Sequence, residues 1–216
     1  SLRLIRYDLR GHGASSCHAP HYRMGALVSD VERLLDTLDV RNSVFVGLSI
    51  GGLIAQGLTV KRLDQVRAMV LSNTAARIGT AETWETRIAS VRSGGMEAIA
   101  DATMERWFAR AVRTTPEAQA MRDLLLQCRP DGYVGCAAAI AGTDFYETTA
   151  TLTLPTLSIA GSEDGSTPPD LVRETAALVR GSRFQLIRGA GHLPCVDRPA
   201  DYAAALAGFL RDIGHI

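Results

Sequence analysis

This sequence lacks a net charge, a long apolar run and any internal repeat. Its 23 basic and 23 acidic residues cancel, so no basic field favours nucleic acid or an anionic membrane as a partner. No stretch approaches the roughly 18 consecutive apolar residues of a membrane-spanning helix. We therefore expect neither a nucleic acid nor a membrane as a partner of this chain.

The sequence is also poor in cysteine, and its four cysteines show no C-x-x-C spacing. They are Cys17, Cys128, Cys136 and Cys195. Zinc sites and the disulfide frameworks of small secreted proteins need closely and regularly spaced cysteines. We therefore expect no metal site and no disulfide bond, and we expect a reducing, cytoplasmic location.

The composition and the hydrophobic pattern of the sequence predict an α/β protein. Hydrophobic residues make up 46% of the chain and charged residues 21%, as in a globular protein that buries a core. Apolar alternation and short apolar runs predict strands at 2–7, 43–46, 66–72, 154–161 and 183–187. Helical periodicity predicts helices at 27–38, 50–61 and 169–179, and a closing helix from Pro199. This alternation indicates a mostly parallel sheet with helices on both faces.

The middle of the chain departs from this alternation. Between residues 77 and 149 helical periodicity persists, with a break at Pro130, and no convincing strand appears. We therefore divide the chain into a core, at 1–76 and 150–216, and a helical insertion at 77–149. Two interpretations of the insertion stay open: a lid over an active site, or a plain helical subdomain without a gating role.

The chain is organised around the G-x-S-x-G motif at 47–51. A run of β-branched and aromatic residues leads into the motif, and an apolar stretch with helical spacing follows it. This context is that of a nucleophile elbow, in which a sharp turn exposes the hydroxyl of Ser49. A Cβ at Gly47 or Gly51 is expected to crowd the turn, and Gly52 lets the helix pack close to the strands. The N-terminus of that helix favours negative charge near the hydroxyl.

Ser49, Asp164 and His192 each follow a predicted strand. The carboxyl ends of parallel strands gather along one edge of a sheet, where ligands bind. A serine nucleophile needs an adjacent base, a histidine can be that base near neutral pH, and an aspartate can orient the imidazole. We therefore predict a catalytic triad, whose chain order is that of α/β-hydrolases. His12, in a glycine-rich loop, is instead interpreted as a structural residue whose ring hydrogen-bonds to the backbone.

Five stretches of the sequence resemble 3-oxoadipate enol-lactonase, an α/β-hydrolase of bacterial aromatic catabolism. They are RYDLRGHG at 6–13, GLSIGG at 47–52, ERWF at 105–108, DGSTPP at 164–169 and GAGHLPCV at 189–196. The first two occur across many α/β-hydrolases, whereas the other three point to the lactonase. The resemblance carries the catalytic residues of that family onto Ser49, Asp164 and His192. It implies an α/β-hydrolase fold and a serine hydrolase that opens a lactone.

The same resemblance implies that the chain hydrolyses 3-oxoadipate enol-lactone to 3-oxoadipate in the β-ketoadipate pathway, with no metal or organic cofactor. The oxyanion is expected to bind the Ile50 N–H and a second N–H from a loop upstream of this sequence. Arg106, beside Trp107, is predicted to bind the substrate carboxylate. The alternative is a surface arginine and a core tryptophan, with Arg77 or Arg87 in the binding role. Another carboxylesterase or lactonase, or an inactive hydrolase-like binding protein, also stays open.

The predicted strand at 2–7 precedes a loop that follows the fourth strand in that family. The resemblance therefore implies that three N-terminal strands and the oxyanion loop are missing from this sequence. The third strand lies inside the family's sheet, so its absence would leave backbone groups on its neighbours without hydrogen-bond partners. We expect the 216-residue chain by itself to fold poorly or to be nearly inactive.

Overall fold

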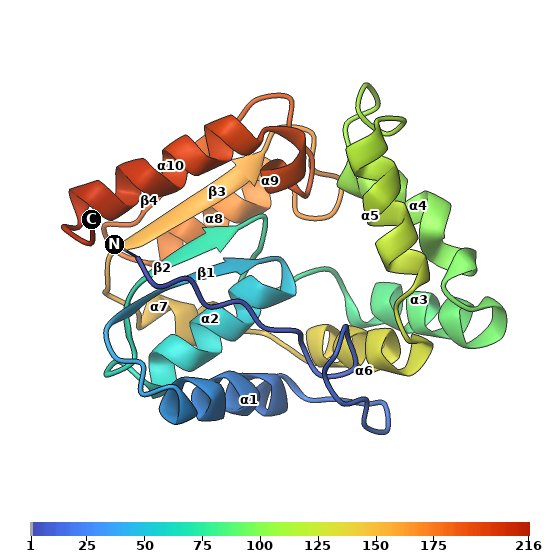
Figure 1. Cartoon of the computed structure of the whole chain (residues 1–216), viewed down its shortest axis with the longest axis horizontal. Helices are drawn as coiled ribbons and strands as arrows, with labels where there is room; N and C mark the ends of the chain where they lie inside the picture. The colour runs from blue at the N-terminus through green and yellow to red at the C-terminus, as the bar shows by residue number, and fades with distance from the viewer. Residues whose placement is uncertain (1) are drawn as a thin grey trace.

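A parallel sheet is the centre of the fold. The computed structural model describes residues 2–216, and Figure 1 shows the arrangement of its elements. Within these residues the sheet has four strands in the order β1-β2-β3-β4. The strands are β1 (Ser43–Leu48), β2 (Val66–Ser72), β3 (Thr156–Gly161) and β4 (Arg183–Ile187). Each neighbouring pair is parallel, so the carboxyl ends of the strands lie along one edge, as predicted.

Helices cover both faces of the sheet, as predicted. The covering helices are α1 (Met24–Thr37), α2 (Ile50–Lys61), α8 (Pro169–Leu178) and α10 (Pro199–Asp212), and a short α9 (Pro194–Asp197) precedes α10. Successive side chains of a strand point to opposite faces. In β2, Val70 belongs to the apolar cluster that contains Phe209 of α10, whereas Leu71 belongs to the cluster that contains Ala55 of α2. This burial on both faces explains the nearly continuous apolar sequence of the strand.

Residues 77–149 form helices and no strand, as the sequence predicted. The helices are α3 (Ala81–Gly94), α4 (Glu97–Trp107), α5 (Pro116–Leu126), α6 (Pro130–Ala141) and α7 (Tyr146–Ala150). Pro130 begins α6 instead of breaking a helix, because proline fits the first turn, where its missing N–H has no intrahelical partner. The side chains of Thr80 and Thr115 cap α3 and α5. Figure 1 shows α3 to α6 beside the carboxyl ends of the strands.

The segment at 2–7 is not the strand that its alternating sequence predicted. It has no regular secondary structure and runs as coil beside the open edge of β1 (Figure 1). Leu4 and Ile5 of this segment and Val44 and Val46 of β1 line a common cavity of about 510 Å³. A strand needs a hydrogen-bonded neighbour roughly 4.8 Å away. The segment lacks such a neighbour within residues 2–216, so its alternation alone does not produce a strand.

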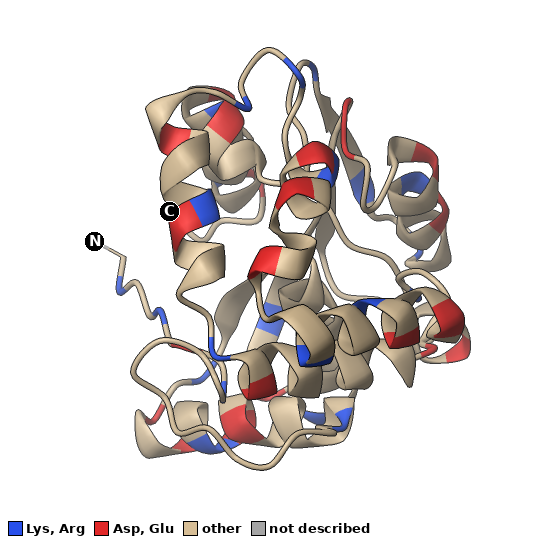
Figure 2. Ribbon diagram, turned by 90° about the vertical axis from the view of Figure 1, so that its right-hand side faces the viewer, with Lys and Arg blue, Asp and Glu red and all other residues tan. Residues whose placement is uncertain are grey.

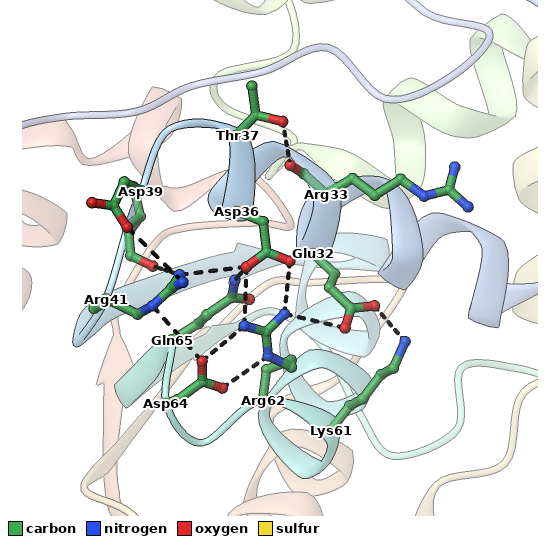
Figure 3. Close-up of polar contacts among 11 residues, drawn as sticks. Glu32, Arg33, Asp36, Thr37, Asp39, Arg41, Lys61, Arg62, Asp64 and Gln65 are labelled. Atoms are coloured by element: carbon green, nitrogen blue, oxygen red, sulfur yellow. Dashed lines mark hydrogen bonds and ion pairs between the residues drawn. The ribbon is translucent and has the colours of Figure 1, made fainter.

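A cluster of charged side chains joins α1 to the end of α2 and the loop that follows it (Figure 3). Arg62 donates to both carboxylate oxygens of Asp36, at 2.9 and 3.0 Å, and to both of Asp64, at 2.8 Å. It also donates at 3.2 Å to Glu32, which pairs with Lys61. The hydrogen bonds from Arg62 lower the pKa of Asp36 and the pKa of Asp64. The cluster therefore stabilises the fold most when these carboxylates are ionised.

Basic and acidic positions are intermixed over the ribbon (Figure 2). This distribution agrees with the equal numbers of basic and acidic residues in the sequence. Among residues 2–216, no helix is both long enough and apolar enough to span a bilayer.

Candidate active site

Ser49 occupies the turn between β1 and α2. Its backbone has φ 54° and ψ −118°, a conformation that residues other than glycine rarely adopt. A Cβ at Gly47 would lie 2.2 Å from the carbonyl oxygen of Gly51, so the turn needs glycine there, as predicted. A Cβ at Gly52 would lie 2.3 Å from Thr74, which excludes a side chain there too. The prediction for Gly51 is wrong, because a Cβ at that position meets no atom within 4 Å among residues 2–216, apart from its chain neighbours and the backbone of its own helix.

Asp164 lies in the loop after β3 and has five hydrogen-bonding partners. The backbone N–H groups of Ser166 and Thr167 donate to Oδ1 at 2.7 and 3.0 Å. The Thr167 hydroxyl, the Asn73 amide and the His192 ring face Oδ2 at 2.7, 2.9 and 2.8 Å. Burial by itself raises the pKa of Asp164, but the hydrogen bond and charge of His192, together with the other donors, outweigh burial and lower it. The Asp164 carboxylate is therefore ionised in the pH range in which histidines titrate.

His192 lies in the loop after β4, with only 3% of its surface exposed. Its Nδ1 is 2.8 Å from Asp164 Oδ2, and an ionised carboxylate can only accept a hydrogen bond. In the neutral ring Nδ1 therefore carries the proton, and Nε2 is left as a base. Ser49 and His192 line the same cavity, although residues 2–216 show no hydrogen bond between Ser49 Oγ and His192 Nε2. Hydrogen bonds of this kind often tighten only around a substrate.

The C-terminal end of α4 contacts the loops that follow β3 and β4. The carbonyl of Arg106 accepts the N–H of Gly165 at 3.0 Å, and the carbonyl of Trp107 accepts the N–H of His192 at 2.7 Å. The Trp107 and His192 rings are also stacked, with their centroids 6.4 Å apart. These contacts position the helical insertion directly against both loops.

A cavity of about 320 Å³ opens beside Ser49 and His192. Its walls are mainly apolar and come from the N-terminal loop, the elbow and the helices α3 to α6. The lining residues are Leu9, His12, Leu48, Ser49, Ile50, Ile78, Gly79, Trp84, Arg87, Thr103, Arg106, Trp107, Leu125, Cys128, Tyr133, Cys136, Ala137, Ile140, Ser166, His192 and Leu193. The predicted oxyanion donor and the predicted substrate-binding residues Arg106 and Trp107 thus border the cavity of Ser49.

Two arginines give this cavity positive charge. The Arg87 guanidinium lies 4.5 Å from the ring centroid of Trp84. Arg106 donates to the Thr103 hydroxyl at 2.9 Å, and its Nε is buried without an acceptor among residues 2–216. Burial, followed by the charge of Arg87, lowers the pKa of Arg106, and no acidic side chain is among the described residues that line the cavity. The cavity is therefore suited to an anionic group, which would satisfy a buried donor and balance the charge.

The sequence did not predict the role of Asn73, because 91 residues separate it from Asp164. The available signal was an asparagine directly after a predicted strand, at the edge where the candidate triad gathers. The predicted hydrogen bond of the His12 ring to the backbone is confirmed, since its Nδ1 lies 3.2 Å from the carbonyl oxygen of Arg10, and the ring also lines the cavity. Arg77, one of the alternative arginines, is not among the lining residues.

The sequence matches the Alpha/beta hydrolase family over residues 1–205. The chain belongs to that family, and the predicted fold class is confirmed by the parallel sheet between layers of helices.

Individual relatives show which members of this family the chain is similar to. The chain is 32% identical to 3-oxoadipate enol-lactonase 2 of Acinetobacter baylyi over 210 residues, which cover 96% of this chain and 78% of the relative. The solved structure of an enol-lactonase from Burkholderia xenovorans is similar with a TM-score of 0.91 and 35% identity, covering 95% of this chain and 80% of that one. A hydrolase from Pseudomonas aeruginosa is similar with a TM-score of 0.90 and 36% identity, covering 95% and 78%. The resemblance to 3-oxoadipate enol-lactonase is therefore confirmed over nearly the whole chain.

Proposed function

We propose that this chain hydrolyses the ester bond of 3-oxoadipate enol-lactone, a lactone that carries a carboxylate. The observation that carries the proposal is the hydrogen bond between Asp164 and His192 beside Ser49, in a cavity with two arginines. The similarity to an enol-lactonase of Acinetobacter baylyi supports the choice of substrate. The proposal includes a role in the β-ketoadipate pathway and a cytoplasmic location, in which the four free thiols would stay reduced.

Ser49 is the proposed nucleophile. Its Oγ attacks the carbonyl carbon of the lactone while His192 Nε2 accepts the hydroxyl proton. Asp164 holds the Nδ1–H of His192 and stabilises the imidazolium that forms. The oxyanion accepts the N–H of Ile50, which begins α2 and is one of the donors that a helix leaves without an intrahelical acceptor.

Ring opening then leaves an acyl group on Ser49. The bond between the carbonyl carbon and the ring oxygen breaks, and the proton held by His192 goes to the departing enolate, which becomes a ketone by tautomerisation. His192 next takes a proton from water as the water oxygen attacks the acyl carbon, and the acid and free Ser49 are released. The net reaction adds one water and gives 3-oxoadipate, and no step requires a metal or an organic cofactor.

Arg106 is the proposed partner of the substrate carboxylate. Its buried Nε has no acceptor within residues 2–216, and a carboxylate would supply one. A hydrogen bond between charged groups contributes roughly 1.5–3 kcal/mol net. Trp107 provides an apolar wall beside His192, and Arg87 adds a second positive charge to the cavity.

The helical insertion at 77–149 is the proposed lid on a core formed by 1–76 and 150–216. Support comes from the side chains of α3 to α6 that line the cavity. The backbone contacts of Arg106 and Trp107 with the loops after β3 and β4 add to this support. A lid in this position would exclude water from the acyl-enzyme until the leaving group has departed.

The test compares ring opening of the enol-lactone with hydrolysis of a neutral aryl ester, in the chain extended by the upstream loop that the sequence resemblance implies, here called the parent, and in its Ser49→Ala variant. We expect the parent to prefer the lactone and to react with a fluorophosphonate, and the variant to lose the label and to keep less than about a thousandth of the turnover. Labelling of Ser49 with a preference for simple esters would indicate another carboxylesterase. Absence of both label and turnover would indicate an inactive, hydrolase-like binding protein. Either result would overturn the proposal.

A further inference from the structure

The carboxyl end of β2 contacts the proposed nucleophile through two neighbours of Asn73. The carbonyl of Ser72 accepts the N–H of Ser49 at 3.0 Å. The hydroxyl of Thr74 donates to the carbonyl of Ser49 at 2.7 Å. Both backbone groups of the strained elbow residue are therefore held by the segment in which Asn73 is the central residue.

Asn73 itself connects the other two loops of the proposed triad. Its Nδ2 donates to Asp164 Oδ2 at 2.9 Å and to the carbonyl of Gly191, the neighbour of His192, at 3.1 Å. Asp164 Oδ2 is also the oxygen that faces Nδ1 of His192. One amide group thus spans the loop after β3 and the loop after β4, at the atom through which the two loops interact.

The orientation of this amide is determined by its partners. An ionised carboxylate and a backbone carbonyl can only accept hydrogen bonds, so both must face the NH₂ group of Asn73. The opposite end, Oδ1, accepts a hydrogen bond from the Ser72 hydroxyl at 3.0 Å. A 180° rotation of the amide, which exchanges Oδ1 and Nδ2, would therefore break all three hydrogen bonds.

The backbone at this position is also constrained. Asn73 is fully buried, its N–H donates to the carbonyl of Ile159 at 2.8 Å, and its φ is 47°. Asparagine is among the few residues other than glycine that adopt this left-handed conformation readily. The position therefore combines an unusual backbone with a side chain that must donate twice.

We propose that Asn73 is a positioning residue that holds the Asp164 carboxylate and the His192 loop in one arrangement. One N–H of its amide holds the carboxylate so that Oδ2 stays opposite Nδ1 of His192, and the other holds the carbonyl of Gly191 in the His192 loop. The relative position of Asp164 and His192 matters because small displacements of catalytic groups lower the reaction rate by large factors. The catalytic consequence of this role rests on the function proposed above.

Asn73→Ala tests the proposal through kinetics and pH dependence. We expect kcat to fall about 10- to 100-fold while KM changes less than about 2-fold, because the lost hydrogen bonds act on the triad. With one donor fewer, Asp164 Oδ2 keeps more negative charge opposite His192, which favours the imidazolium. The rising limb of kcat/KM should therefore move to higher pH. Asn73→Asp, which places a second carboxylate there, should move it at least as far.

Two controls separate positioning from general loss of structure. Asn42 has a similar φ of 55° but is exposed, so Asn42→Ala should leave the activity and its pH dependence unchanged. Other ionisable groups near the triad, namely Glu163, Asp197 and Arg106, are the same in parent and variants. They cannot account for a shift that appears only on substitution of Asn73.

A measurement without turnover keeps this inference distinct from the proposed function. The Nδ1–H resonance of His192 and its titration midpoint can be followed by NMR in the parent and in Asn73→Ala. We expect the midpoint to rise and the resonance to move in the variant. Unchanged NMR signals would overturn the positioning role, whatever the activity, as would a loss of activity without any shift of the pH profile. Activity that survives Ser49→Ala would instead overturn the proposed function, and the NMR comparison would still decide the role of Asn73.

Discussion

Neutralising Arg106 should separate recognition of an anionic lactone from hydrolysis of a neutral ester. Arg106→Gln removes the guanidinium whose Nε is buried without an acceptor in the described part of the chain. A carboxylate bound there loses a charge-assisted hydrogen bond that contributes roughly 1.5–3 kcal/mol. Since about 1.36 kcal/mol corresponds to a factor of ten, kcat/KM for the lactone should fall about 10- to 160-fold. The neutral ester makes no such bond, and its kcat/KM should change less than about 3-fold.

The same substitution should not destabilise the fold. Burial and the charge of Arg87 lower the pKa of Arg106, so the folded state disfavours the charge that the variant removes. We therefore expect Arg106→Gln to unfold at the same temperature as the parent or at a higher one. Arg110→Gln is the matched control, because Arg110 is exposed and is not among the residues that line the cavity. It should change neither activity nor stability.

The assay measures initial rates with both substrates for the parent and the two variants, beside thermal unfolding curves. A selective loss on the lactone by Arg106→Gln, with an unchanged melting temperature, is the expected pattern. Equal losses on the lactone and the ester would refute the assignment of the carboxylate to Arg106. The role would then pass to Arg87, the other arginine of the cavity.

Three further predictions concern the triad, the elbow and the charged cluster. Asp164→Asn should lower kcat by roughly four orders of magnitude, because the neutral amide favours the wrong histidine tautomer. Initial rates with the lactone measure this loss, and a kcat within about 10-fold of the parent would contradict the triad. Gly52→Ala should lower the stability by about 1–3 kcal/mol in denaturant titrations, since its Cβ would lie 2.3 Å from a Thr74 atom, whereas Gly51→Ala, which meets no atom, should not. Arg62→Leu should unfold in less urea than the parent at pH 7. A carboxylate whose pKa is lowered by folding stabilises the folded state at pH values above its ordinary pKa of about 4, and it loses this effect as the pH falls through its pKa in the folded state. The difference in stability between the parent and Arg62→Leu should therefore disappear near pH 2. A difference that persists at that pH would argue against the ion pairs.

Much of the fold was determined by local sequence. The helix α2 and the strand β2 have the bounds that their apolar patterns predicted, at 50–61 and 66–72. These patterns are reliable because side-chain spacing decides which face of an element can be buried. The elbow at Ser49 was likewise recognisable, since the need for glycine at 47 arises from atoms only four residues away.

Features that depend on distant partners were decided only by the tertiary structure. The segment 2–7 alternates like a strand but forms none, because a strand needs a neighbour that its own sequence cannot supply. The amide of Asn73 donates to Asp164, which is 91 residues away in the sequence. The local sequence around Asn73 therefore could not predict the acceptor of this amide. Arg106 is distinctive for the acceptor that its Nε lacks, and that depends on how α3, α4 and α6 enclose the cavity. Sequence thus determined which residues carry chemistry, and packing determined which of their hydrogen-bonding groups are satisfied and which remain available.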